Sequence, residues 1–323
     1  FMARCLGYFN RTSTEKITVL VATSGDTGGA VASGFLGVPG VEVVILYPKG
    51  KVSHIQELQL TTQGQNITSF EVDGVFDDCQ EMVKTAFLDE TLKPHRNLTS
   101  ANSINVARWL PQSFYYFFAV QELMKKKVNN PFVFSVPSGN FGNICAGFIA
   151  RELGLPISHF IASTNQNDTF PRYMENGIFE PKPSVQTISN AMDVGNPSNF
   201  DRICKLFNQD LYRLKNVCSS YCFSDKETKT AMQDLYENFS YISDPHGAVG
   251  YLGLQKYCEN NPEVYGVFLE TAHPVKFLDV VEKAIKTKVS IPPQIEEIMG
   301  RNSEKTSISS YRELKEFLID NAI

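Results

Sequence analysis

Strand-like and helix-like segments alternate along most of this chain, and that order constrains the fold more than any other feature of the sequence. Runs of β-branched and apolar residues predict six strands, at Ile17–Ala22, Val41–Tyr47, Ile67–Val72, Phe132–Val136, Ile157–Ser163 and Tyr265–Leu269. Helices are predicted at Thr27–Leu36, His54–Gln63, Asp77–Leu88, Ile104–Lys127, Asn143–Leu153, Lys226–Asn238 and Ala248–Cys258. Strands that are joined through helices pair in parallel, so we expect an α/β fold with helices on both faces of a parallel sheet.

The length of the chain predicts two lobes. Its 323 residues exceed what one average core holds. Residues 104–127 are apolar nearly all round and are expected to form a buried helix that links the lobes. We therefore expect a smaller α/β lobe at 1–115, a larger one at 116–290 and a C-terminal tail at 291–323. Residues 184–200 are polar and without period, which predicts a long ordered loop.

Composition narrows the class of protein. The net charge is −5, which gives no electrostatic case for a nucleic-acid partner, and no apolar run reaches the roughly 18–20 residues that span a bilayer. The seven cysteines are scattered and have no zinc-like spacing with histidine. We expect a cytoplasmic enzyme with reduced thiols, no metal, and no membrane or nucleic-acid partner.

A glycine-bearing polar turn, Ser138-Gly139-Asn140-Phe141-Gly142-Asn143, follows one strand-like run and opens a helix-like stretch. Glycine lets the backbone approach a ligand, and the free N–H groups and dipole at a helix start attract an anion. Asn140 and Asn143 add donors without adding charge. A tight strand-to-helix connection is the alternative, but the polar residues exceed what a turn needs. We favour a phosphate site.

A second turn of the same build, Thr23-Ser24-Gly25-Asp26-Thr27-Gly28, follows the strand-like run that ends at Ala22. Asp26 makes phosphate a poorer fit here, while neutral donors such as Ser24 and Thr27 suit a substrate amine or carboxylate. Asp26 could equally be a helix N-cap. Two such turns in one chain predict an enzyme that holds a phosphorylated cofactor against a small polar substrate.

Three further segments carry candidate chemistry. Asn105 and Arg108 are three residues apart, and on one helical face the arginine could clamp an anion; a capped helix start with a surface arginine is the alternative. His246 is either an acid or base or a structural hydrogen-bonding residue. Thr271 follows the last predicted strand, where a neutral hydroxyl suits a pyridine nitrogen, while His273 could simply pack.

In order along the chain, these segments resemble the threonine synthase family, in its bacterial and fungal branch. The resemblance rests on Thr23–Gly28, Asn102–Asn105, Ser138–Asn143, Ser189–Asn199, Asp244–His246 and Thr271–Pro274, and it extends from Phe1 to about Lys286. It implies a fold-type II, tryptophan synthase β-like enzyme with pyridoxal 5′-phosphate as cofactor. It also implies a lyase of threonine biosynthesis that converts O-phosphohomoserine and water to L-threonine and phosphate.

The resemblance also implies roles for individual residues. Ser138, Gly139, Asn140, Phe141, Gly142 and Asn143 would hold the cofactor phosphate, Thr271 would meet the pyridine nitrogen, and Asp26 would lie near the cofactor ring. Ser24 and Thr27 would bind substrate, with Ser103, Asn105 and Arg108 on the side of its phosphate. Asn190, Asp193 and Asn196 would order a loop over the site.

The chain departs from the family pattern in one respect. The family's Schiff-base lysine sits in a phenylalanine-lysine-aspartate motif, which this sequence lacks; Lys16, Lys49, Lys51 and Lys276 stand in other contexts. The resemblance places that lysine upstream of Phe1, and the sequence begins inside an apolar, helix-like pattern. We therefore expect a piece of a longer active enzyme, itself inactive and without a catalytic residue.

Two other interpretations stay open. One is a threonine or serine dehydratase-like enzyme of the same cofactor group, and the other is a non-catalytic, cofactor-binding relative. The sequence leaves a monomer and a homodimer equally open.

Overall fold

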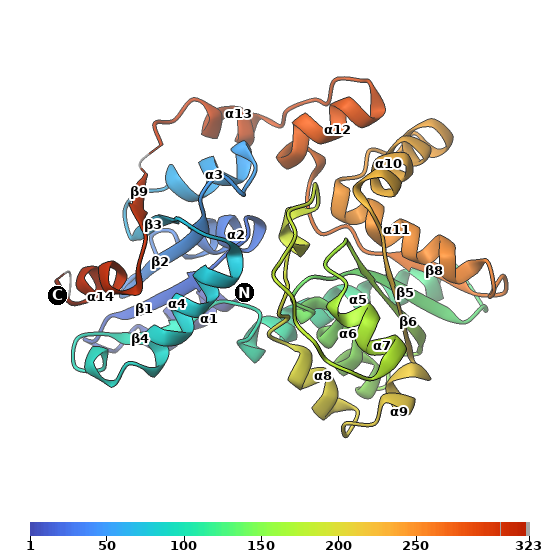
Figure 1. The fold of residues 1–323 in the computed structure, drawn as a ribbon, viewed down its shortest axis with the longest axis horizontal. Helices are drawn as coiled ribbons and strands as arrows, with labels where there is room; N and C mark the ends of the chain where they lie inside the picture. Colours follow the sequence, from blue (N-terminus) through green and yellow to red (C-terminus); the bar gives the residue numbers. More distant parts are fainter. Residues whose placement is uncertain (304, 321–323) are drawn as a thin grey trace. The chain divides into compact units, whose positions relative to one another are not determined.

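The chain folds into two compact units, each built on its own parallel sheet (Figure 1). The computed structural model describes residues 1–303 and 305–320. Unit 1 comprises Phe1–Asn105 with Ile291–Ile323, and unit 2 comprises Val106–Ser290. The predicted α/β class with parallel-sheet cores is confirmed. The border lies ten residues before the expected one at 115/116, and the C-terminal segment belongs to unit 1 instead of forming a separate tail.

Unit 1 contains a five-stranded sheet in the order β4-β1-β2-β3-β9, in which every pairing is parallel. Its strands are β1 (Ile17–Ala22), β2 (Val41–Pro48), β3 (Ile67–Val72), β4 (Asn97–Ser100) and β9 (Thr306–Ile308). Val19, Leu20 and Val21 of β1 are completely buried, which accounts for the unbroken apolar run of this strand.

Helices precede and connect these strands. They are α1 (Met2–Asn10), α2 (Asp26–Phe35), α3 (His54–Thr61), α4 (Phe76–Leu88) and the 3₁₀ turn η1 (Glu90–Leu92). The start of α3 is fixed by a capping box, in which Ser53 accepts from the Gln56 N–H and the Gln56 side chain accepts from the Ser53 N–H.

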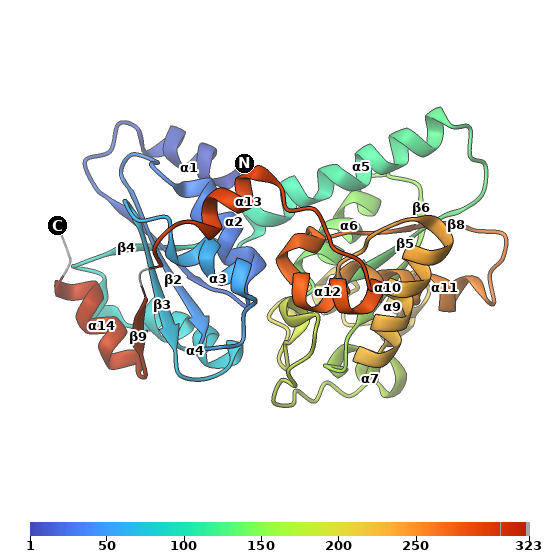
Figure 2. The same cartoon turned by 90° about the horizontal axis from the view of Figure 1, so that it is seen from above.

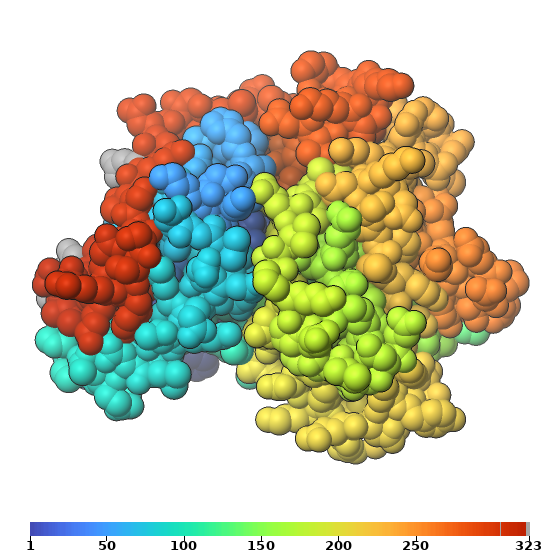
Figure 3. Space-filling model, in the orientation of Figure 1, coloured from blue at the N-terminus to red at the C-terminus, as the bar shows by residue number. Residues whose placement is uncertain are grey.

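The C-terminal segment completes unit 1. Its elements are α13 (Pro293–Met299), β9 and α14 (Tyr311–Asp320). Strand β9 pairs with β3, and the Nε of Arg96 donates to the Leu318 carbonyl at 2.7 Å. The ring of Phe317 meets Phe70 edge to face, with centroids 4.8 Å apart. The red surface of this segment accordingly lies against blue and cyan residues of the same unit in Figure 3.

Unit 2 contains a four-stranded, all-parallel sheet in the order β7-β6-β5-β8. The strands are β5 (Phe132–Pro137), β6 (Ile157–Thr164), β7 (Cys218–Cys222) and β8 (Tyr265–Phe268). The helices are α5 (Trp109–Lys125), α6 (Gly142–Glu152), α7 (Thr169–Asn176), α8 (Phe200–Leu206), α9 (Leu211–Lys215), α10 (Asp225–Phe239), α11 (Pro245–Cys258) and α12 (Leu278–Ile285), with 3₁₀ turns η2 (Val106–Arg108), η3 (Asn190–Met192) and η4 (Pro274–Phe277).

Helix α11 lies unusually close to the sheet of unit 2. A Cβ at Gly253 would lie 1.9 Å from the Ser163 Oγ, so only glycine fits there. The Ser135 Oγ donates to the Gly250 carbonyl at 2.5 Å and lies 2.9 Å from the Ser163 Oγ. This approach fixes the first turn of α11 at the carboxyl edge of the sheet.

Helix α5 differs from its predicted form. It begins at Trp109, after the 3₁₀ turn η2, and one of its faces is exposed, with Leu110 53%, Phe118 64% and Met124 55% accessible. The expectation of a helix buried all round is therefore wrong, since only the Trp109, Tyr116 and Val120 side packs into the core. Figure 2 shows α5 running along one edge of unit 2. Among the described residues, no helix is both long and apolar enough to cross a membrane.

Candidate functional site

The turn between β5 and α6 presents a row of backbone donors. Among the described residues, the N–H groups of Gly139 to Asn143 donate no hydrogen bond to the chain, whereas the Ser138 N–H is bound to the Ser163 carbonyl at 2.9 Å. The row leads into the first turn of the 11-residue helix α6, which begins at Gly142. We call residues 138–143 the phosphate cup, because such N–H groups and the helix dipole favour an anion.

The backbone of the cup turns sharply at Phe141. This residue has φ 61° and ψ 15°, a left-handed conformation that costs a non-glycine residue roughly 1–2 kcal/mol. Its buried ring packs on Phe170, with centroids 4.6 Å apart, which holds the conformation in place. When neighbouring residues alternate between right-handed and left-handed backbone conformations, their N–H groups point toward one spot.

The polar side chains of the cup bind mainly to the protein itself. The Asn143 amide donates to the Pro137 carbonyl at 2.8 Å, and its oxygen accepts from the Ser138 hydroxyl at 3.2 Å. The Asn140 oxygen accepts from the N–H and hydroxyl of Ser198, at 2.7 and 2.9 Å. The asparagines therefore shape the cup and tie it to the loop at 184–199, and the backbone supplies the donors that face outward.

Gly139 allows the turn η3 to form a wall of the cup. A Cβ at Gly139 would lie 2.7 Å from the Met192 Cα and 3.1 Å from the Ala191 oxygen. The predicted ordered loop is present, and η3 is its only regular turn within the described chain.

Asp193 organises that loop, a role that the family resemblance implied. Its carboxylate accepts from the Thr187 N–H and hydroxyl at 2.9 and 2.7 Å, and from the side-chain amides of Asn165 and Asn167 at 2.9 and 3.2 Å. Burial raises the pKa of Asp193 to about 7, and these donors oppose that rise. Asn196, predicted to share this role, is exposed. Sequence reasoning missed Asn165, which lies just beyond β6.

Thr271 lies at the same edge of the sheet as the cup. Strands β5 and β8 pair in parallel with Ser135 opposite Phe268, so Ser138 and Thr271 each lie three residues past a matched pair. Thr271 is exposed, which leaves its hydroxyl accessible to a ligand.

Glu270, just before Thr271, was not singled out from the sequence. Its carboxylate accepts from the Ser243 hydroxyl at 2.8 Å and lies against Gly247, where a Cβ would overlap it. Desolvation against the first turn of α11 and the nearby Asp244 carboxylate both raise the pKa of Glu270.

The two histidines near this edge are bonded within the protein. His246 is 1% exposed; its Nδ1 lies 2.6 Å from the Asp244 Oδ1, and its Nε2 accepts from the Ala191 N–H at 3.1 Å. The His273 Nδ1 accepts from the Val275 N–H at 3.1 Å and caps η4. Both histidines therefore have structural roles, as the second interpretation of each predicted. The contact of His246 with η3 nevertheless links it to the cup.

The second predicted turn lies in unit 1, between β1 and α2. The Thr23 hydroxyl accepts from the N–H groups of Gly25 and Gly28, at 3.0 and 2.8 Å. Gly25, with φ 136°, is the N-cap of α2, so the alternative that Asp26 is the N-cap is wrong. Asp26 instead accepts from the Gln56 side chain at 3.2 Å.

The segment after β4 also lies in unit 1. Asn102 binds both backbone groups of Ala22, accepting from its N–H at 3.0 Å and donating to its carbonyl at 2.5 Å. The Asn105 amide donates to the Ser100 carbonyl at 2.7 Å. Asn105 precedes η2, so it does not share a helical face with Arg108 as predicted. Ser103 is half-buried. Burial lowers the pKa of Arg108, which lies in η2 at the start of unit 2.

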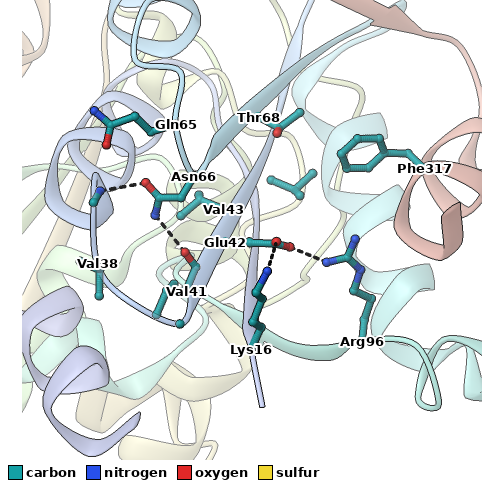
Figure 4. A pocket seen from close by; sticks show the side chains of 13 residues that line it. Lys16, Val38, Val41, Glu42, Val43, Gln65, Asn66, Thr68, Arg96 and Phe317 are labelled. Carbon is teal, nitrogen blue, oxygen red and sulfur yellow. Dashed lines mark hydrogen bonds and ion pairs between the residues drawn. The ribbon is translucent and has the colours of Figure 1, made fainter. Parts of the chain in front are cut away.

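A cavity of about 500 Å³ opens elsewhere in unit 1, near the amino ends of β1, β2 and β3 (Figure 4). Its charged residues pair with one another, because Glu42 binds both Lys16 and Arg96 (Figure 4). Asn66 donates to the Val41 carbonyl at 2.9 Å. Ligands of open parallel sheets bind at the carboxyl ends of strands, so this cavity is not the candidate site.

The cup fits a phosphate group on structural grounds. It offers several uncommitted backbone donors at a helix start and a wall that a Cβ at residue 139 would disrupt. Thr271 adds a hydroxyl at the same edge, which could meet the ring nitrogen of a phosphorylated pyridine. The arrangement therefore suits pyridoxal phosphate.

Comparisons with known proteins agree with this geometry. The family model "Pyridoxal-phosphate dependent enzyme" matches residues 2–267, and the model "Threonine synthase, C-terminal" matches residues 247–318. The chain is 44% identical to a threonine synthase of Buchnera aphidicola (subsp. Acyrthosiphon pisum), over 99% of this chain and 73% of that protein.

Solved structures give the same result. The structure of threonine synthase from Escherichia coli is similar with a TM-score of 0.93 at 43% identity, over 99% of this chain and 73% of that one. The structure of PLP-bound threonine synthase from Brucella melitensis is similar with a TM-score of 0.86 at 32% identity, over 99% and 74% of the two chains.

Proposed function

The chain belongs to the threonine synthases, a family of pyridoxal-phosphate-dependent enzymes, and from that premise we propose that its substrate is O-phosphohomoserine. The products are L-threonine and phosphate. The observation that carries this proposal is the phosphate cup at the start of α6, with Thr271 at the same sheet edge. The predicted family, cofactor and enzyme class are thus confirmed, whereas the substrate and the residue roles remain proposals.

The residues of unit 2 would hold the cofactor. The backbone N–H groups of 139–143 would bind its phosphate, with Ser138 and Asn143 fixing the turn, and Asn140 anchoring the loop beside it. The Thr271 hydroxyl would meet the ring nitrogen without protonating it, since a neutral hydroxyl is a weak acid. When bound, pyridoxal phosphate serves as an electron sink that stabilises negative charge on the substrate carbons.

Substrate binding requires a second set of donors. Ser24 and Thr27 lie in the turn that opens α2, and their neutral hydroxyls suit a carboxylate or amine. Asp26 stays near them, positioned by Gln56, and would lie beside the cofactor ring. Ser103, Asn105 and Arg108 are our candidates for the substrate phosphate, with Arg108 supplying the charge that a leaving phosphate needs.

Location and assembly follow the sequence-based predictions as proposals. All seven cysteines are free thiols, which suits a reducing compartment and supports a cytoplasmic enzyme. We propose a monomer or a homodimer with no nucleic-acid or membrane partner, in keeping with the net charge of −5.

The proposal is tested with the complete product of the gene that encodes this chain, because the relatives are longer than the chain. Supplied with pyridoxal phosphate, that protein should release phosphate from O-phosphohomoserine. A dehydratase-like enzyme would instead form keto acid from threonine or serine, and a non-catalytic relative would bind the cofactor without turnover. Either result would overturn the proposed substrate.

A further inference from the structure

His246 occupies a constrained position at the start of α11. Asp244 is the N-cap of this helix; its carboxylate accepts from the N–H groups of His246 and Gly247, at 2.8 and 3.4 Å. The same carboxylate lies 2.6 Å from the His246 Nδ1. Both side chains are at most 1% exposed, so the imidazole cannot turn without breaking buried hydrogen bonds.

These contacts define the protonation state of the ring. The Ala191 N–H is a donor, so the His246 Nε2 that receives it carries a lone pair and no proton. The proton of the neutral imidazole is then on Nδ1, where it is donated to Asp244. Burial works against ionisation of Asp244, but His246 outweighs it and keeps the pKa of this carboxyl below its usual value.

The hydrogen bond from Ala191 connects this pair to the phosphate cup. Ala191 is the central residue of η3, and its carbonyl and the Met192 Cα are the atoms that a Cβ at Gly139 would meet. The ring therefore binds the same three-residue turn that forms the wall of the cup. Met192 also packs with Val249 of α11, so η3 keeps an apolar anchor when the hydrogen bond is lost.

We propose that His246 is a positioning residue whose unprotonated Nε2 holds η3 against Gly139 and thereby sets the affinity of the cup for the cofactor phosphate. The inference rests on the proposed role of the cup in cofactor binding. It assigns no proton transfer on the substrate to His246, since both ring nitrogens are occupied by protein partners.

Acid should weaken this arrangement. A proton on Nε2 would place two donors face to face, His246 and the Ala191 N–H. Two carboxyls interact with the ring, Asp244 from its own helix start and Asp193 from the loop after η3, and Glu270, which follows β8, lies beside Asp244. The element η4 contributes Phe277, an uncharged ring 4.9 Å away. These carboxyls would tolerate an imidazolium, but the Ala191 contact would not.

The test compares two substitutions of His246 that differ in which ring nitrogen the new side chain can replace. In His246→Gln the side chain reaches as far as Nε2 and can accept from the Ala191 N–H, whereas His246→Asn reaches only as far as Nδ1. The probe is pyridoxamine 5′-phosphate, which has no aldehyde and cannot react with a lysine. His159→Gln, in the same unit, is the control for loss of a histidine.

We expect His246→Asn to bind the probe at least tenfold more weakly than the wild type, and His246→Gln and His159→Gln to stay within about threefold. Hydrogen exchange at the Ala191 amide should quicken tenfold or more in His246→Asn alone. Between pH 7.5 and 5.5 the wild-type affinity should fall more steeply than that of His246→Gln, because only the wild type can take up a proton on the atom that accepts from the Ala191 N–H. The probe's own phosphate titrates equally in both proteins and cancels in the comparison.

Equal affinity of wild type and His246→Asn, or equal weakness of the two variants, would overturn the inference. So would parallel pH profiles of the wild type and His246→Gln. Failure of the wild type to bind the probe would instead count against the proposed cofactor site. The Ala191 exchange rate would then still decide whether His246 holds η3.

Discussion

The backbone of Gly139 lies so close to Met192 that an added Cβ would sit 2.7 Å from the Met192 Cα. The contact joins a turn at the end of β5 to one that lies more than fifty residues later, and it forms the wall of the phosphate cup. Because the colliding atoms are backbone, no side-chain rotation can relieve the overlap.

Gly139→Ala should therefore displace η3 and weaken binding of pyridoxamine 5′-phosphate at least tenfold, a loss of about 1.4 kcal/mol. Calorimetric titration measures it. Gly34→Ala, in α2 with open space around it, is the matched control; it should leave binding unchanged and raise helix stability by about 0.5–1 kcal/mol. Unchanged affinity in Gly139→Ala would mean that the wall does not shape the cup.

Asp193→Asn should destabilise unit 2 by about 1–3 kcal/mol, because an amide NH₂ would face groups that are all donors. Those donors are the N–H and hydroxyl of Thr187 and the amides of Asn165 and Asn167. Urea unfolding checks the change, with Glu81→Gln on the exposed face of α4 as the neutral control. Equal stability of the two variants would show that the loop does not depend on the carboxylate.

His159 predicts a pH dependence of stability. Burial lowers its pKa to about 4 from the ordinary 6.5, while its ring stacks on Tyr257 at 4.8 Å and its Nε2 lies 2.9 Å from the Ser219 Oγ. The unfolded chain then binds the proton first, so stability falls as the pH drops from about 6.5 to 4, by about 1–3 kcal/mol.

The measurement for His159 compares urea midpoints of the wild type and His159→Phe at pH 7 and 4.5. Phe keeps the stacking surface but cannot titrate, so the variant should lose less stability on acidification. Carboxylates titrate alike in both proteins and cancel in the difference. An identical loss in the two proteins would exclude His159 as a source of acid sensitivity.

Arg108→Gln should lower kcat/KM for O-phosphohomoserine by about 10- to 100-fold, since a charge-assisted hydrogen bond contributes about 1.5–3 kcal/mol. Steady-state phosphate release by the complete gene product measures the effect. Arg4→Ala, on the exposed side of α1, serves as the control and should behave like the wild type. If Arg108→Gln also retained full kcat/KM, Arg108 would not meet the substrate phosphate.

Much of the fold could be predicted from periodicity alone. The apolar runs at β1, β2, β3, β5, β6 and β8 were long enough to identify, and the structure places each within two residues of its expected ends. Strands β4, β7 and β9 escaped prediction. Strand β4 has four residues, none of them buried; β7 is largely polar (Cys218–Cys222); and β9 has only three residues.

The cup was predictable as well, because a glycine-bearing turn between a strand and a helix has a local signature. Its supporting contacts were not. Glu270 and Asn165 act through partners that are distant in sequence, Ser243 and Asp193, and no local pattern marks such pairs. Asn105 and Arg108 do not share the expected helical face. Asn105 lies before the helical segment, and its side-chain amide donates to the Ser100 carbonyl.

The central claim is that this member of the threonine synthase family acts on O-phosphohomoserine. The most direct test incubates the complete gene product with pyridoxal phosphate and O-phosphohomoserine and quantifies threonine and inorganic phosphate in the same samples. We predict that both appear together in equal amounts. Phosphate without threonine, or neither product from a cofactor-loaded protein, would contradict the claim.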